Sequence, residues 1–255
     1  MPRNPFSEFE EVPDEVAKQL ESHNRVNGLL STVQNLFGEF AQEDDKQLPM
    51  DKILASHDSA MERLTNAYGQ LVAECLGDAL WQADRQTIEK TYAVAWQMVN
   101  EMEWELTDVE AFCTYALQSG DSAFFVMDPL GLFLSAFCNA SSLSEIHLDL
   151  SGEDLKLSLL GYQLREGLTL TLVGDFGDLI GISLNGGHLI INGNVRHYLG
   201  AGMIAGQIDV SDNAGRFIGE QMQGGEIHID GRLGGVGNPQ GGTIYHRQQV
   251  IYGKK

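Results

Sequence analysis

The chain contains 255 residues, of which 43% are hydrophobic and 20% are charged, so it can form one large domain or two modest domains with their own cores. No apolar run reaches the roughly 18 residues that cross a bilayer. Residues 1–15 carry acid and proline where an export signal needs a basic start and an apolar stretch, so we expect a cytoplasmic protein. The formal net charge of −20 repels phosphate backbones and anionic lipid, which argues against nucleic acid and membranes as partners.

The negative charge is concentrated in the first part of the chain. Residues 1–140 contain 24 acidic and 8 basic side chains, a net charge of −16, whereas residues 141–255 contain 12 and 8, a net charge of −4. The hydrophobic pattern changes near the same position, from helical periods to short alternating segments with many glycines. We therefore predict an acidic α-helical domain over 1–140 and a β-domain over 141–255.

Apolar residues recur at intervals of three and four in four stretches of the first domain, which predicts four amphipathic helices. The stretches are residues 14–40, 61–75, 88–102 and 109–117. Thr107 and Glu110 have the spacing of a capping box at the start of the fourth helix, and Gly120 is expected to end it. The charged segment 41–50 is predicted to be a loop.

Residues 123–138, AFFVMDPLGLFLSAFC, are too apolar for an exposed linker. Asp128-Pro129 and Gly131 interrupt the run, so we expect a buried, irregular junction between the two domains. The three cysteines, Cys75, Cys113 and Cys138, are widely spaced and fit neither a disulfide framework nor a thiolate metal site. They are predicted to be reduced, buried thiols.

A nineteen-residue interval organises the second domain. Alignment at this interval places residues of one kind in the same column from coil to coil. The columns are Leu170, Leu189, Ile208 and Ile227; Leu172, Ile191, Val210 and Ile229; Leu179, Tyr198 and Phe217; Gly181, Gly200 and Gly219; and Leu184, Met203 and Met222. The pattern extends upstream to Ile146–Leu150, and a coil shortened by about two residues ends it at Gly241–Ile244.

Nineteen residues are too few for a strand, a helix and a return, but suffice for one coil of strands and tight turns. Stacked coils place the members of each column about 4.8 Å apart, so that the columns become apolar ladders. We therefore predict an α+β protein with segregated parts, in which the helical domain is followed by a right-handed parallel β-helix.

Two successive coils carry a recognisable motif. Its residues are Gly200-Ala-Gly-Met203-Ile-Ala-Gly206-Gln-Ile208-Asp-Val210 and Gly219-Glu-Gln-Met222-Gln-Gly224-Gly225-Glu-Ile227-His-Ile229-Asp-Gly231. Residues 165–245 thereby resemble the GXGXG domain that occurs in the large chain of glutamate synthase and in formylmethanofuran dehydrogenases. The resemblance implies a right-handed β-helix without catalytic residues that holds other domains or subunits in place. Because the amidotransferase, flavin and iron–sulfur parts do not accompany it here, glutamate synthase activity is not expected.

No residues of the sequence have the spacing of a metal, cofactor or catalytic site, so we predict no metal and no cofactor and assign no catalytic residue. The histidines of the repeat region occupy different positions of the coil, whereas metal ligands must converge. These are His188, His197, His228 and His246. The glycine runs at 174–178, 185–188 and 234–242 are predicted to be turns, because no helical pattern follows them as it would in a phosphate-binding loop.

Two pairs of a nucleophile and a base, Cys113 with His57 and Ser183 with His188, have no local motif behind them. Five aromatic residues of the helical domain lie partly at helical spacing and are predicted to be core rather than a ligand cage. These are Trp81, Tyr92, Trp96, Trp104 and Phe112.

Three functions remain open. The favoured one is a non-catalytic scaffold or interaction protein, whose β-helix is a rigid module and whose partner is another protein or a second copy. The others are an accessory structural component of a redox or amidotransferase complex, and a small enzyme with a site between the two halves that unites Asp128, His57 or Cys113. Val250, Ile251 and Tyr252 are expected to form a last strand, at an end that is available to another chain.

Overall fold

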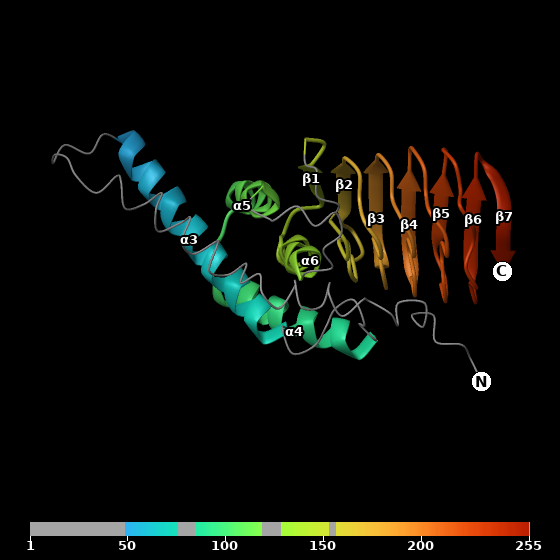
Figure 1. Ribbon diagram of the computed structural model, residues 1–255, viewed down its shortest axis with the longest axis horizontal. Coiled ribbons are helices and arrows are strands. Elements are labelled where there is room, and N and C mark those ends of the chain that lie inside the picture. Colours follow the sequence, from blue (N-terminus) through green and yellow to red (C-terminus); the bar gives the residue numbers. More distant parts are fainter. Residues whose placement is uncertain (1–48, 76–84, 119–128, 153–156, 255) are drawn as a thin grey trace, which may run out of the picture.

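The computed structural model describes residues 49–75, 85–118, 129–152 and 157–254. In these residues four helices precede a single seven-stranded sheet. The helices are α3 (Pro49–Cys75), α4 (Arg85–Glu101), α5 (Leu106–Gln118) and α6 (Leu130–Ala140). Figure 1 shows the strands in one row with the helices gathered at the β1 end. The predicted fold class, helices followed by a parallel β-solenoid, is confirmed.

The strands follow one another in the sheet in the order in which they occur in the chain. They are β1 (Glu145–Asp149), β2 (Thr169–Val173), β3 (Asn185–Asn192), β4 (Ala205–Val210), β5 (Glu226–Ile229), β6 (Gly242–His246) and β7 (Gln249–Lys254). The first six are parallel neighbours, as successive coils of a solenoid require. The expected last strand is present as β7, which turns back and pairs antiparallel with β6. The prediction that another chain binds at this end stays a prediction.

The strand register confirms the predicted columns. Leu170 pairs with Leu189, which pairs with Ile208 and then with Ile227. The last coil is shorter, since Ile227 pairs with Ile244. All five side chains are fully buried, so they form a continuous aliphatic ladder inside the solenoid.

A column of glycines faces this ladder from the opposite wall. Gly200 has a φ of +63°, and a Cβ built there would lie 2.6 Å from Cδ1 of Ile227. The left-handed backbone and the space that the isoleucine occupies therefore both disfavour a side chain at this position. Gly181 and Gly219 repeat the same close approach one coil away on either side. The solenoid is thin because its two walls touch at these glycines.

Two polar ladders, which the repeat pattern did not predict, also run along the coils. The N–H and Nδ2 of Asn194 donate to Oδ1 of Asp175, and those of Asn213 donate to Oδ1 of Asn194. The N–H of Arg232 in turn donates to Oδ1 of Asn213 at 2.8 Å. Each side chain thus satisfies a backbone donor of the following coil at a turn, where the strand ladder does not reach.

The second polar ladder explains His197. Its N–H donates to Oδ1 of Asp178 at 2.9 Å, and its Nδ1 accepts from the N–H of Arg216 at 3.0 Å. Because Nδ1 is an acceptor, the ring proton resides on Nε2. His197 is therefore a turn residue that connects two coils.

The apolar junction differs from its prediction. Its burial is confirmed, because every residue from Leu130 to Asn139 is buried, but residues 130–138 form helix α6 instead of an irregular segment. Gly131 lies within the helix, and its place against the first coil requires glycine, because a Cβ there would overlap the carbonyl oxygen of Ser158. Residues 123–128 lie outside the part of the chain that the structure describes.

Two of the other predicted helices lie in the described part of the chain. Helix α4 confirms its predicted stripe, with Ile88, Ala95 and Val99 buried. Helix α3 begins at Pro49, within the predicted loop 41–50, because proline is well suited to the first turn of a helix. The predicted helix over 14–40 lies outside the described residues.

The predicted capping box of α5 is wrong. The N–H of Glu105 donates to Oδ2 of Asp108 at 3.4 Å, and the N–H of Val109 donates to the carbonyl of Glu105. The helix therefore begins at Leu106, and the residues that cap it are Glu105 and Asp108, each two positions before its predicted counterpart, Thr107 or Glu110.

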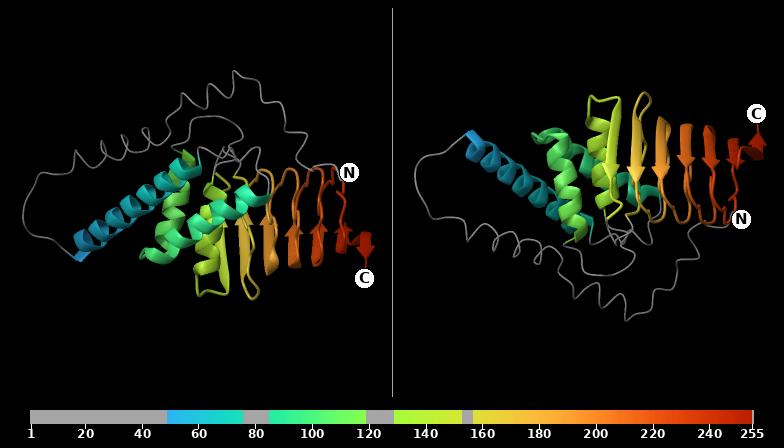
Figure 2. Two further views of the ribbon diagram at one scale, coloured as in Figure 1. Left: turned by 90° about the horizontal axis from the view of Figure 1, so that it is seen from below. Right: turned by 90° about the horizontal axis from the view of Figure 1, so that it is seen from above.

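One hydrophobic core connects the helices to the coils. Its buried side chains extend from α3 through α6 and along the solenoid as far as Ile244. Helix α3 packs on α5 and α4 on α6, and Figure 2 shows α4 running beside the first strands. No helix in the described part of the chain is long and apolar enough to span a bilayer.

Candidate functional site: the groove beside helix α4

Helix α6 lies against the free end of the first coil. Its side chains make the hydrogen bonds that the backbone of a preceding coil would make. Oγ of Ser135 accepts hydrogen bonds from the N–H groups of Gly161 at 2.9 Å and Tyr162 at 3.2 Å, and donates to the carbonyl of Gly131. Gly131, Ser135 and Asn139 recur every four residues, so they share one edge of the helix. This edge supplies the bonds that a preceding coil would otherwise provide.

Asn139 continues this edge to the surface. Its Oδ1 accepts from the N–H of Arg165, and its Nδ2 donates to the carbonyl of Tyr162 and to the phenol oxygen of Tyr92. Three of its hydrogen-bonding positions are thus occupied by three elements: α4, the first coil and the segment before β2. The buried amide fixes Tyr92 against the solenoid.

Arg165 binds the C-terminal end of α6. Its guanidinium donates to the carbonyls of Asn139, Ser141 and Leu143 at 3.3, 2.9 and 2.7 Å. A cation at this position satisfies the free carbonyls of the helix and interacts favourably with its dipole. Arg165 is therefore a structural clamp, and few of its donors remain for a bound anion.

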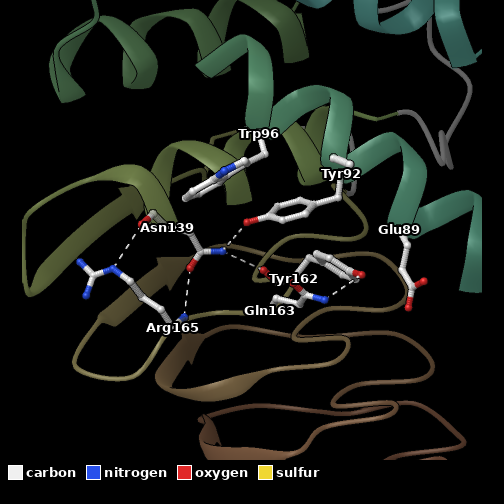
Figure 3. Close-up of a pocket in the computed structure, with 8 residues that line it drawn as sticks. Glu89, Tyr92, Trp96, Asn139, Tyr162, Gln163 and Arg165 are labelled. Carbon is white, nitrogen blue, oxygen red and sulfur yellow. Dashed lines mark hydrogen bonds between the residues drawn. The ribbon is translucent and has the colours of Figure 1, made fainter. Parts of the chain in front are cut away.

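A groove of about 520 Å³ lies above this junction. Its lining comes from α4, α6 and the first coil, and Figure 3 shows the side chains that surround it. The lining residues are Glu89, Tyr92, Ala93, Trp96, Asn139, Tyr162, Gln163 and Arg165. We call this the α4 groove.

Three aromatic rings form most of its apolar surface. The rings of Tyr92 and Tyr162 are 4.7 Å apart between centroids, and those of Tyr92 and Trp96 are 6.2 Å apart. Trp96 is 39% exposed, whereas Tyr162 is only 2% exposed and forms the floor. An exposed tryptophan supported by two packed tyrosines is a preorganised apolar surface with little side-chain entropy to lose.

Both phenols keep their protons at neutral pH. Burial raises the pKa of Tyr162 to about 12, and the charge of Glu89 acts in the same direction. Burial also raises the pKa of Tyr92, partly offset by its hydrogen bond with Asn139. The carboxylate of Glu89 is exposed and pairs with Arg85 at 2.7 Å, a surface ion pair that contributes little to stability.

Two hydrogen-bond donors of the groove have no acceptor among the residues that the structure describes. They are the indole Nε1–H of Trp96 and the O–H of Tyr92, whose oxygen is itself an acceptor for Asn139. An unused donor at the edge of an exposed ring can bind a carbonyl of another molecule. The α4 groove thus offers aromatic ring faces and hydrogen-bond donors, which are groups that bind another molecule.

The residues that the sequence suggested for an enzyme site do not meet in the described structure. Cys113 is fully buried in the helical core. The ring of His188 bonds to Asp209 of the next coil, so its described partner is not Ser183. Asp128 and the side chain of His57 lie outside the described residues.

The prediction of reduced, buried thiols is confirmed for Cys113 and Cys138. Burial raises the pKa of the Cys138 thiol to about 12, which keeps it protonated and unreactive. Within the described ranges, no three His, Cys, Asp or Glu side chains are grouped so that they could hold a metal ion.

Most residues of the α4 groove were not predicted as a site from the sequence. Phe112 and Trp104 pack in the core as predicted, but Trp96, predicted as core, is exposed. Asn139, Gln163 and Arg165 carried no signal by themselves, although the spacing of Gly131, Ser135 and Asn139 in an apolar run could have revealed a polar edge.

Searches of protein-family models, of curated proteins and of solved structures found no match to this chain. The parallel β-solenoid therefore stands on the strand register alone, and the GXGXG resemblance stays an expectation.

Proposed function

We propose that this protein is a non-catalytic interaction scaffold, in which the α4 groove binds a partner and the solenoid is a rigid spacer. The observation that carries the proposal is the exposed Trp96 beside Tyr92, held in place from below by α6 and the first coil, with donors left unused. Aromatic residues on a rigid support are the usual centres of binding energy at protein interfaces.

The solenoid supports the scaffold role by its regularity. Six strand spacings separate β1 from β7, which at about 4.8 Å each gives a spacer of roughly 29 Å. Ladders of side chains fasten every coil to its neighbours, so the groove and the far end keep a fixed separation.

Affinity purification of the tagged full-length chain from its own source tests the proposal. Wild type is compared with Trp96→Ala and with Ile204→Ala, which removes another exposed apolar side chain from a coil away from the groove. We expect a stoichiometric partner to decrease more than tenfold with Trp96→Ala, the size of an interface hot spot, and to stay with Ile204→Ala. Equal recovery of all partners with the three proteins would contradict a binding role of the groove.

A further inference from the structure

The occupant of the α4 groove can be inferred from the shape of its walls. One wall is the side of helix α4 and the other is a turn of the first coil, so no strand edge is available for an added strand. Aromatic grooves with donors at their edges bind extended polyproline-type segments. Such segments have no internal hydrogen bonds and present free carbonyls, and they lose little entropy on binding.

The chain itself contains one segment with this pattern. Of its six prolines, only Pro2 and Pro5 have the Pro-x-x-Pro spacing. A polyproline helix has three residues per turn, so Pro2 and Pro5 lie on one face, about 9 Å apart. Arg3 between them has the charge opposite to that of Glu89, which lies at the rim of the groove and also pairs with Arg85.

We infer that the α4 groove holds the segment Pro2-Arg3-Asn4-Pro5 of the same chain, with the prolines on the rings of Trp96 and Tyr92 and with Arg3 toward Glu89. This inference rests on the proposed binding role of the groove and adds its regulation, because a partner has to displace the segment to reach Trp96. The Trp96 indole N–H and the Tyr92 O–H donate to carbonyls of the segment.

The connection is long enough for this contact. Residues 6–48 separate the segment from the start of α3. Even at the short rise of a helix, about 1.5 Å per residue, 43 residues span about 65 Å. Helix α3, with 27 residues, is only about 40 Å long. Attachment to the same chain also gives the segment an effective concentration on the order of millimolar near the groove. A separate molecule would have to be present at that concentration to compete equally.

Photocrosslinking of the full-length chain tests the inference. Gln163, an exposed residue of the lining, is replaced by p-benzoylphenylalanine, and unlabelled and ¹⁵N-labelled chains are mixed before irradiation. Mass spectrometry is expected to find position 163 linked to residues 2–5. In each linked pair both peptides should be unlabelled or both should be ¹⁵N-labelled, which shows that the link formed within one chain. The yield should fall roughly tenfold, the effect of about 1.4 kcal/mol of lost contact, in the Pro2→Ala/Pro5→Ala variant.

Two controls make the result specific. Pro13→Ala removes a proline outside the Pro-x-x-Pro segment and should leave the yield unchanged, and a photoreactive residue at Glu226 on β5 should not link to residues 2–5. The inference is overturned if residues 2–5 are not linked, if the linked peptides carry different isotopes, or if loss of both prolines has no effect. In each of those cases a partner lost with Trp96→Ala would still support the scaffold function, so the two failures can be told apart.

Discussion

At the scale of single residues, the coils depend on positions that accept one residue type for two reasons at once. Gly200 combines a left-handed backbone with a neighbour that leaves no room for a methyl group. Asn213 is a donor to one coil and an acceptor for the next. Because the columns repeat, a residue at such a position contacts both neighbouring coils, so a substitution there disturbs both.

We predict that Gly200→Ala lowers the free energy of unfolding by about 3 kcal/mol, since the left-handed backbone costs an alanine about 1–2 kcal/mol and overlap with Ile227 costs a similar amount. Urea unfolding measures the change. Gly167→Ala is the matched control, because Gly167 also has a positive φ, of +76°, but nothing within 4 Å of an added Cβ. It should lose only the backbone part, so an equal loss in both variants would show that the close approach to Ile227 is unimportant.

At the scale of elements, α6 is the part on which the groove depends. It has a buried apolar body and one polar edge, and that edge bonds to the backbone of the first coil. The helix therefore terminates the solenoid and also holds the floor on which Tyr92 and Trp96 rest.

Ser135→Ala is expected to lower the free energy of unfolding by about 2–4 kcal/mol, because it leaves the buried N–H groups of Gly161 and Tyr162 without an acceptor. Ser142→Ala, a change of the same size at an exposed position after α6, should be neutral. Denaturant titration compares the two variants. A loss below about 0.5 kcal/mol for Ser135→Ala, the range of ordinary surface substitutions, would mean that α6 is held by its apolar contacts alone.

The success of sequence-based prediction also differs between elements. The solenoid was predictable because each column repeats one residue type at a fixed step, so Leu189, Ile208 and Ile227 identify one another. Helix α6 was not, because a helix that is buried on all sides has no amphipathic period. The groove could not be predicted, because the exposure of Trp96 depends on how α4 lies against the first coil.

At the scale of the whole molecule, the coils are interchangeable units between two different ends. Polar and apolar ladders continue from β2 to β5, while α6 and β7 differ from everything between them. The number of coils therefore sets the length of the spacer without affecting the groove.

Insertion of a second copy of residues 194–212 after Asp212 should give a folded protein with one additional coil, because the copied Asn194 falls in the same ladder as Asn194 and Asn213. Small-angle X-ray scattering is expected to show a maximum dimension greater by about 5 Å, one strand spacing. Insertion of residues 194–203 alone adds about half a coil and should disrupt the fold. Similar circular dichroism and unfolding for both insertions would contradict the modular interpretation.

The reversed direction of β7 affects the tendency of these molecules to aggregate through the edge of the sheet at high concentration. A parallel coil ends in a row of backbone groups that can template the same strand from another molecule, which is how cross-β fibrils grow. β7 runs against that direction and has a register shift opposite Ile244 and Tyr245, and irregular edges of this kind resist strand addition. The reversed, irregular β7 therefore leaves a poorer template for strand addition than a further parallel strand would leave at the same edge.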